Sequence, residues 1–472
     1  MDPAALLALV RDELAPDLGD GVVTTDADVV AAHSRDEALF CPDDGAVALV
    51  RARTVADVQA TMRFASRHAV PVVPQGARTG LSGGANAVPG CLLLSVASMT
   101  RVLDLDPGER TITVEPGVIN ADLKEAVAEH GLSYPPDPGS VAISSIGGNV
   151  ATNAGGLCCV KYGVTRDYVR ALQVVLADGT LTTIGARTAK GVAGLDVRSL
   201  FVGSEGTLGI IVSITLRLVP LVPQPLTAVA TFADERAGAT TVSAFMAAGA
   251  QPSMLESLDR TSLQMLNAYG DFGLDAHAGA MLLIQSDGAG SREAALAEVE
   301  TFTRHAEAQG ALEVAFSDDA ADSEALVAAR RLAQTAYEHY ARSHGGGQLL
   351  DDVCVPREQL PIFYERLDRI RTATGLTIAA VAHAGDGNLH PSIFFSTTDP
   401  DEVARARRAF DEIMQVGLEL GGTITGEHGV GHLKRGWLAR ELDEGNRGIH
   451  RAVKAALDPL GILNPGTMFA DL

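Results

Sequence analysis

The stretch Ser144-Ser-Ile-Gly-Gly-Asn-Val-Ala-Thr-Asn-Ala-Gly-Gly156 mixes glycine with serine, threonine and asparagine. Two further stretches share this composition, Pro74-Gln-Gly-Ala-Arg-Thr-Gly-Leu-Ser-Gly-Gly84 and Gly203-Ser-Glu-Gly-Thr-Leu-Gly209. Each offers backbone N–H groups and hydroxyl donors, which bind pyrophosphate oxygens. None has the pattern of a Walker loop, and none opens a βαβ unit as a dinucleotide fingerprint does. A single loop of this kind is usually a tight turn, but three in one domain favour an extended cofactor.

A second pattern combines histidine and carboxylate side chains in glycine-rich surroundings. It consists of His383-Ala-Gly-Asp-Gly-Asn-Leu-His390 and Thr425-Gly-Glu-His-Gly-Val-Gly431. Imidazole and carboxylate together suit zinc and similar divalent ions, and three protein ligands leave coordination positions open for a substrate. One additional titratable histidine indicates a site where a proton is moved. The alternative is a hydrogen-bonded glycine-rich turn, because only a strand–turn–strand would bring His383 and His390 together.

The composition limits the class of protein and of partner. The 472 residues, 46% hydrophobic and 20% charged, predict a globular protein of two or three domains. The net charge of −22 disfavours nucleic acid and anionic membrane surfaces as partners. An anionic substrate would therefore need a local positive group, such as a metal ion or an arginine.

The five cysteines and the N-terminus indicate the compartment. The cysteines are scattered and odd in number, and no cysteine run for an iron–sulfur cluster occurs. The acidic N-terminus lacks the pattern of a signal peptide, and no window of about 18 apolar residues predicts a membrane span. We expect a reduced, cytoplasmic protein.

The hydrophobic pattern predicts two α+β regions on either side of a proline-rich boundary. Before it we expect a helix over 54–68 with Thr54 as N-cap, and strands at 70–74, 91–95, 111–115, 171–177 and 210–218. Pro220, Pro223 and Pro225 mark the boundary. After it we expect strands at 226–232, 281–285 and 393–396, and helices near 234–248, 291–309, 323–342, 357–374, 403–420 and 447–457.

The three glycine-rich stretches resemble the flavin-binding segments of the vanillyl-alcohol-oxidase type. The rear half resembles the FAD-linked oxidase C-terminal domain found in the flavin-binding chain of glycolate oxidase, in D-lactate dehydrogenase and in D-2-hydroxyglutarate dehydrogenase. The resemblance extends from about residue 30 to Asn464-Pro-Gly466. It implies an α+β fold with a vanillyl-alcohol-oxidase-type FAD-binding domain of two subdomains (1–219). It also implies an α+β cap domain with an antiparallel sheet and the metal site (220–430), and a segment returning to the FAD domain (431–472).

The resemblance also implies the residues that bind FAD, with the 74–84 segment around the pyrophosphate. These residues are Pro74, Gln75, Gly76, Ala77, Arg78, Thr79, Gly80, Ser82, Gly83, Pro138, Gly139, Ser144, Ser145, Gly148, Asn149, Asn153, Ala154, Gly155, Gly156, Tyr162, Gly163, Glu205, Gly209, Ile210 and Asn464. No histidine matches a covalent flavin attachment, so we expect non-covalent FAD.

The same resemblance assigns the chemistry. His383, His390 and Glu427 match the family's ligands of one divalent metal, zinc or manganese, and His428 matches its base. A 2-hydroxy acid would chelate the metal, His428 would take its hydroxyl proton, and the Cα hydride would pass to the flavin to give a 2-oxo acid. Arg330 matches an arginine that clamps the substrate carboxylate; its alternative role is a solvated helix charge.

One departure from the family bears on the substrate. Members that oxidise 2-hydroxyglutarate carry a lysine just before the stretch that begins at Asp351, where this chain has Leu349-Leu350. A distal carboxylate would be poorly held without that cation. The sequence therefore favours a short D-2-hydroxy acid of the D-lactate or glycolate class, with D-2-hydroxyglutarate as the alternative.

Electrons would leave to an external acceptor, which could be a quinone, an electron-transfer flavoprotein, a cytochrome or oxygen. The sequence leaves open whether the chain forms a homodimer and whether it lies peripherally at the inner face of the membrane. Three competing hypotheses also stay open. One is a flavin-free metalloenzyme, such as a zinc hydrolase or an iron oxygenase. The others are a non-catalytic protein that binds FAD within a glycolate oxidase complex and an ether-lipid synthase of the same flavin family.

Overall fold

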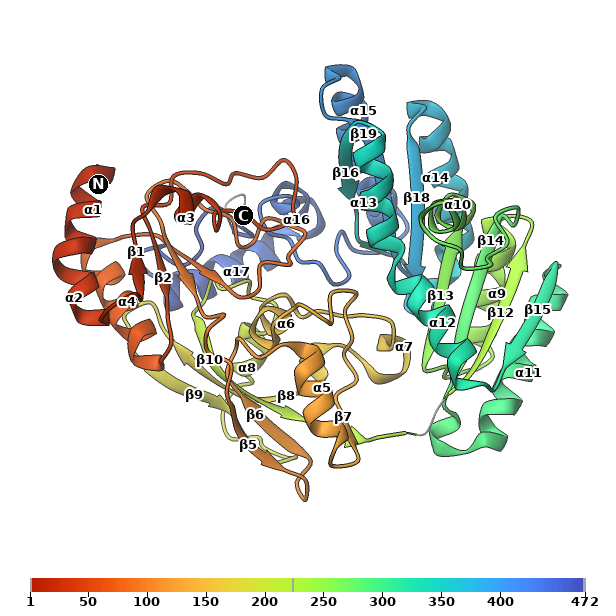
Figure 1. Cartoon of the computed structure of the whole chain (residues 1–472), viewed down its shortest axis with the longest axis horizontal. Helices are drawn as coiled ribbons and strands as arrows, with labels where there is room; N and C mark the ends of the chain where they lie inside the picture. Colours follow the sequence, from red (N-terminus) through yellow and green to blue (C-terminus); the bar gives the residue numbers. More distant parts are fainter. Residues whose placement is uncertain (1, 223–224, 470–472) are drawn as a thin grey trace. The chain divides into compact units, whose positions relative to one another are not determined.

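The computed structural model describes residues 2–222 and 225–469, in two compact units (Figure 1). The first unit comprises the residues up to Gly155, Val164–Leu221 and the residues from Glu427 onward, and the second comprises Gly156–Gly163 and Val222–Gly426. Pro223 of the expected proline-rich boundary lies outside the described residues. The domain bounds expected from the sequence stay a prediction.

A small, mainly parallel sheet forms the first part of the first unit. Its order is β1 (Val23–Thr24), β2 (Ala48–Arg51), β4 (Leu92–Ser95) and β3 (Val72–Gln75). The connection from β2 to β3 contains α4 (Val55–His68), which confirms the predicted helix; Thr54 caps it in a reciprocal pair with Asp57. Buried residues of α4 and of these strands share one hydrophobic core with the short N-terminal helices α1 (Pro3–Leu9) and α2 (Ala15–Leu18).

An antiparallel sheet forms the second part of the first unit. Its order is β5 (Val102–Asp106), β6 (Thr111–Val114), β10 (Ile210–Arg217), β8 (Val169–Val175) and β9 (Leu181–Gly185). The helices α5 (Asn120–Ala128), α6 (Ile146–Thr152) and α8 (Arg198–Phe201) contribute to the core of this part. The 144–156 glycine-rich stretch thus contains the whole of helix α6, with Ser145 as its N-cap.

The chain end belongs to the first unit. Helices α16 (Arg435–Glu441) and α17 (Glu444–Leu457) precede a short extended segment. In that segment Leu463 pairs with Val72 of β3, and the Asn464 N–H donates to the Val72 carbonyl at 2.8 Å. The chain end is therefore fixed beside the strand that leads into the first glycine-rich stretch.

A larger antiparallel sheet dominates the second unit (Figure 1, green to blue). Its order is β15 (Glu313–Ser317), β12 (Leu226–Phe232), β14 (Ala280–Ser286), β13 (Met254–Asp259), β18 (Thr377–His383), β19 (Asn388–Ser396) and β16 (Gly346–Leu350), and β17 (Val353–Cys354) also pairs with β19. Its helices are α9 (Glu235–Ala247), α10 (Arg260–Tyr269), α11 (Arg292–Ala308), α12 (Ala320–Arg331), α13 (Ala333–Ser343), α14 (Leu360–Thr374) and α15 (Pro400–Glu419).

The predictions for this unit were incomplete, because helix α10 and strands β13, β15, β16, β17 and β18 were not expected. The helix expected over 323–342 is two helices, α12 and α13, which meet at Leu332. The strands β13 and β18 were not predicted, because a buried charge interrupts the apolar pattern of Met254-Leu255-Glu256-Ser257-Leu258 and because Ala-rich β18 carries little strand propensity. In the part of the chain that the structure describes, no helix is long and apolar enough to cross a membrane.

Candidate active site

Two of the three glycine-rich stretches, 74–84 and 144–156, meet through one serine. The Ser145 hydroxyl accepts hydrogen bonds from the Ala77 and Gly148 N–H groups, each at 3.3 Å. A Cβ on Gly76 would lie 2.5 Å from that hydroxyl oxygen, so the close approach requires glycine. The 74–84 loop and the start of α6 are therefore held together, as expected of two segments that share one ligand.

Three of the residues implied to bind FAD carry a buried oxygen that lacks a hydrogen-bond partner among the described residues. These atoms are Gln75 Oε1, Ser144 Oγ and Asn464 Oδ1. The amide nitrogens of the first and last are fixed: Gln75 Nε2 donates to the His33 and Ala85 carbonyls, and Asn464 Nδ2 donates to the Gly84 and Glu205 carbonyls. A fixed side chain with one unsatisfied buried acceptor fits a ligand that brings donor groups.

Four of the eight described non-glycine residues with positive φ are among the residues implied to bind FAD. Arg78, Asn153, Glu205 and Asn464 all have positive φ, between 41° and 61°. Residues other than glycine adopt this region at a cost and do so mainly at functional sites. The strain and the unsatisfied oxygens therefore mark the same loops, and both observations fit a bound cofactor.

Glu205 fixes the loop that follows His428. Its fully buried carboxylate accepts hydrogen bonds from the Val430 and Gly431 N–H groups at 2.7 and 2.8 Å. Burial raises the pKa of Glu205 to about 7, although the two N–H groups favour its ionised form. The Ser82 hydroxyl donates to the His428 carbonyl at 3.1 Å, so two of the glycine-rich stretches hold this loop.

The remaining residues implied to bind FAD lie in both units. Gly209 ends the third glycine-rich stretch and Ile210 starts β10, both in the first unit. Gly156, Tyr162 and Gly163 belong to the second unit, where the Tyr162 hydroxyl and the Lys161 ammonium both bind the Asp287 carboxylate. The contacts of Tyr162 within its own unit were not foreseen from the sequence.

A strand–turn–strand brings two of the three expected metal ligands together in the second unit. His383 ends β18, His390 lies on β19 opposite Val381, and the two ring centroids are 5.0 Å apart. Both imidazoles are buried. The turn needs its glycines, because a Cβ on Gly387 would lie 2.1 Å from the Val355 carbonyl oxygen. The strand–turn–strand that the sequence required for His383 and His390 to come together is therefore present.

A buried carboxylate binds both His383 and Arg330. His383 Nδ1 lies 2.9 and 3.0 Å from the Glu256 oxygens, and Arg330 Nη2 lies 2.7 Å from Glu256 Oε2. Burial alone would raise the pKa of Glu256, but His383 and Arg330 together hold it below its ordinary value. Arg330 is 7% exposed, so the alternative of a solvated helix charge is wrong.

Arg330 keeps one unsatisfied donor. Its Nε–H is buried and has no hydrogen-bond partner among residues 2–222 and 225–469. Burying such a donor costs roughly 1–3 kcal/mol. A donor of this kind, beside an ion-paired Nη2, fits an acceptor oxygen supplied by a ligand.

A second carboxylate, Asp352, lies 3.6 Å from His390 Nδ1. It accepts hydrogen bonds from Asn388 Nδ2 and the Thr425 hydroxyl at 2.9 and 2.6 Å, and its carbonyl accepts one from the Gly426 N–H. The segment that leads into Glu427 is thereby fixed. Glu427 and His428 place ligand-type atoms within 4.8 Å of each other, as do Asp352 and His390.

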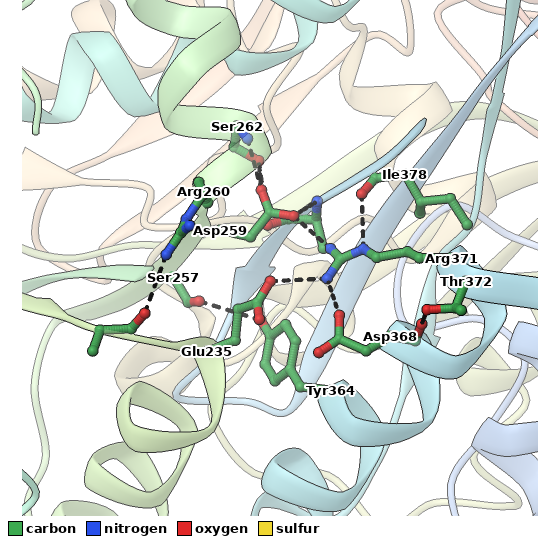
Figure 2. A network of polar contacts seen from close by, with 12 residues as sticks. Glu235, Ser257, Asp259, Arg260, Ser262, Tyr364, Asp368, Arg371, Thr372 and Ile378 are labelled. Carbon is green, nitrogen blue, oxygen red and sulfur yellow. Dashed lines mark hydrogen bonds and ion pairs between the residues drawn. The ribbon is translucent and has the colours of Figure 1, made fainter. Parts of the chain in front are cut away.

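A different buried network surrounds Arg371 (Figure 2). Arg371 donates to Asp259, Glu235 and Asp368 at 2.6, 2.8 and 2.6 Å, and its Nε–H donates to the Ile378 carbonyl. Asp259 also accepts from the Ser262 and Ala380 N–H groups. Every nitrogen of this guanidinium has a protein acceptor, so the network is complete without a ligand.

Sequence reasoning missed Glu256, Asp352 and Asn388. The available signal was a charged residue inside an apolar run, Met254-Leu255-Glu256, because carboxylates are rarely buried without a specific partner. That signal shows that a partner is needed, but it does not identify His383, which lies 127 residues further along the chain.

Comparisons with known proteins identify the family of this chain. The FAD binding domain model matches residues 46–185, and the model of the C-terminal domain of FAD linked oxidases matches residues 224–468. The glycolate oxidase subunit GlcD of Bacillus subtilis (strain 168) is 41% identical over 423 residues, which cover 90% of this chain and 89% of that protein. The D-lactate dehydrogenase of Anaerostipes hadrus is 34% identical over 431 residues, with 89% and 88% covered.

Solved structures show the same fold. Substrate-bound p-cresol methylhydroxylase superposes with a TM-score of 0.82 at 17% identity, covering 99% of this chain and 97% of that one. The 4-ethylphenol oxidase from Gulosibacter chungangensis superposes with a TM-score of 0.80 at 21% identity, covering 98% and 97%. The expected vanillyl-alcohol-oxidase-type fold is confirmed. The chain belongs to the family of FAD-linked oxidases and is an FAD-dependent oxidoreductase.

Proposed function

We propose that this oxidoreductase converts a short D-2-hydroxy acid, of the D-lactate or glycolate class, into the 2-oxo acid. The relatives named glycolate oxidase and D-lactate dehydrogenase support the substrate class. The observation that carries the proposal is the buried group of Glu256, His383 and Arg330, in which the Arg330 Nε–H lacks an acceptor among the described residues. That donor fits the carboxylate of a small acid.

One divalent ion, zinc or manganese, would be held by His383, His390 and Glu427. Two buried imidazoles and a carboxylate fit either ion, because both accept mixed nitrogen and oxygen donors. The ion would supply Lewis acidity and lower the pKa of the substrate hydroxyl. Asp352 and its partners Asn388 and Thr425 would keep the 425–427 segment in place for this role.

His428 would take the hydroxyl proton as general base. Its backbone carbonyl accepts a hydrogen bond from the Ser82 hydroxyl. The Glu205 carboxylate binds the N–H groups of Val430 and Gly431, which follow His428 in the chain. A positioned histidine contributes about 10²–10⁴-fold to such a proton transfer. Non-covalent FAD would supply the acceptor for the Cα hydride, held by the 74–84, 138–163 and 203–210 segments and Asn464.

Arg330 would bind the substrate carboxylate. Its Nη2 is anchored by Glu256, so a ligand would meet a guanidinium whose orientation is already set. Strand β16, which pairs with β19, offers Gln348, Leu349 and Leu350 and no cation. Gln348 binds Gln334 and Ser392, and Leu349 is buried, so this strand would not hold a second carboxylate. A short monocarboxylate therefore fits better than D-2-hydroxyglutarate.

The electrons would leave to an external acceptor such as a quinone, an electron-transfer flavoprotein, a cytochrome or oxygen. We propose a cytoplasmic location, with peripheral contact to the membrane only through that acceptor. A homodimer is compatible with this proposal and would be tested by sedimentation.

The test is an anaerobic titration of the purified yellow protein with four acids: D-lactate, glycolate, L-lactate and D-2-hydroxyglutarate. Bleaching of the flavin bands by D-lactate or glycolate, and much slower bleaching by the other two, is the expected result. Preferential bleaching by D-2-hydroxyglutarate would move the substrate to the dicarboxylate alternative. Flavin bands that no 2-hydroxy acid bleaches would contradict the proposal.

A further inference from the structure

Glu256 occupies an unusual position for a carboxylate. It is completely buried in the interior of β13, one of the central strands of the large sheet. The antiparallel register that pairs Ser257 with Ala382 brings Glu256 beside His383. A buried charge is tolerated only with close partners. Glu256 binds His383, which is proposed to bind the metal ion, and Arg330, which is proposed to bind the substrate carboxylate.

The bond to His383 determines which imidazole nitrogen would be available to a metal ion. An ionised carboxylate only accepts hydrogen bonds, so His383 Nδ1, at 2.9 Å from Glu256, must carry the proton. Nε2 then keeps its lone pair and would be the atom through which His383 holds a metal ion. A carboxylate behind a metal-binding imidazole fixes the ring and raises its basicity, and losing it typically costs 10–100-fold in metal affinity.

The bond to Arg330 determines where the guanidinium points. Nη2 is held 2.7 Å from Glu256 Oε2, and the planar group leaves its Nε–H in a fixed direction. A guanidinium that is already oriented loses less conformational entropy when it binds a carboxylate. One carboxylate therefore orients two groups of different function.

We propose that Glu256 is a positioning residue that sets the His383 imidazole and the Arg330 guanidinium together, so that metal affinity and substrate affinity both depend on one side chain. The proposal rests on the proposed function, because a metal ion at His383 is part of it. The alternative is that Glu256 forms a purely structural ion pair. Its substitution would then lower the stability of the protein but would change neither the metal affinity nor the substrate affinity.

The experiment uses the FAD-containing full chain after removal of metal with a chelator. Zinc and manganese affinities are measured by competition with a chromophoric chelator, in the wild type, Glu256→Gln, Arg330→Met and Asp259→Asn. Asp259 is the matched control, because it is an equally buried carboxylate on the same strand that binds Arg371 instead. We expect about 10–100-fold weaker metal binding in Glu256→Gln, and less than about twofold change in the other two variants.

The substrate effect is separated by a double variant. Arg330→Met and Glu256→Gln should each raise KM for D-lactate or glycolate by at least about 10-fold, as loss of one charged hydrogen bond does. With zinc or manganese at saturating concentration, Glu256→Gln should raise KM no further in the Arg330→Met background, but it should still weaken metal binding. FAD content and thermal midpoint are recorded for each variant, and Glu256→Asp, which keeps the charge but shortens the reach, replaces Glu256→Gln if that variant does not fold.

The outcomes separate the two proposals. A wild type that binds metal, together with a Glu256→Gln variant that binds it equally well, would overturn the positioning role and leave the proposed function intact. Additive KM effects in the double variant would overturn the path through Arg330. A wild type that binds no metal at all would contradict the proposed function, and the positioning role with it.

Discussion

Two buried carboxylates, Glu256 and Asp259, lie three residues apart on β13, and their surroundings differ. Asp259 binds Arg371, whose nitrogens all have protein acceptors (Figure 2). Glu256 binds Arg330, whose Nε–H has no acceptor among the described residues. Burial raises the pKa of Asp259, whereas His383 and Arg330 outweigh burial and lower the pKa of Glu256. A saturated network stabilises the fold, and an unsaturated one indicates a ligand.

The largest expected effect belongs to His428, the base proposed for the reaction. His428→Ala should lower kcat by about 10²–10⁴-fold, because the hydroxyl proton loses its acceptor. FAD content and thermal midpoint should stay near the wild-type values. The matched control is His68→Ala, whose ring pairs with Glu13 in the first unit, and which should keep normal turnover. Loss of FAD from His428→Ala would mean that the histidine supports the cofactor instead.

The reverse pattern is expected for the saturated network. Asp259→Asn should lower the free energy of unfolding by roughly 3 kcal/mol, since a buried arginine loses a charged partner. Glu235 and Asp368 remain beside Arg371 and limit the loss. Turnover measured below the lowered thermal midpoint should match the wild type. A loss of kcat without a loss of stability would place Asp259 in the reaction and remove the contrast between the two carboxylates.

Metal should stabilise only protein that keeps His383, one of the expected metal ligands. At a free zinc or manganese concentration of 100 times Kd, the free energy of unfolding should rise by about 2.7 kcal/mol. A rise in the thermal midpoint is expected for the wild type and for Asp259→Asn, but not for His383→Gln. An equal rise in His383→Gln would show that the ion binds elsewhere.

The smallest effect concerns Glu205, a buried carboxylate with backbone donors instead of an arginine. Its pKa of about 7 in the folded chain exceeds its ordinary value of 4.5. Folding therefore favours the protonated form, and its stabilising contribution is complete below pH 4.5 and is lost as the pH rises through 7. The loss should be about 2 kcal/mol between pH 5 and pH 7. Thermal unfolding of the wild type should show this slope, and Glu205→Gln should reduce it; equal slopes would place the titrating group elsewhere.

Much of the fold and the outline of the site could be predicted from the sequence. Helix α4 was predictable because Thr54 and Asp57 form a local cap, and His383 and His390 met because a short turn links their strands. Those features depend on neighbours in the chain. Glu256, Asp352 and the division of the 323–342 helix depend on contacts between distant segments, for example Glu256 with residues 330 and 383. No local pattern specifies such partners.

The most direct test of the account is the rate of anaerobic flavin reduction by D-lactate or glycolate, measured by rapid mixing before and after chelation. The metal-free protein should keep its FAD and its flavin spectrum but should reduce at least about 10²-fold more slowly. Adding back zinc or manganese should restore the rate. An unchanged rate after metal removal, verified by metal analysis, would contradict a catalytic role for the ion at His383 and His390.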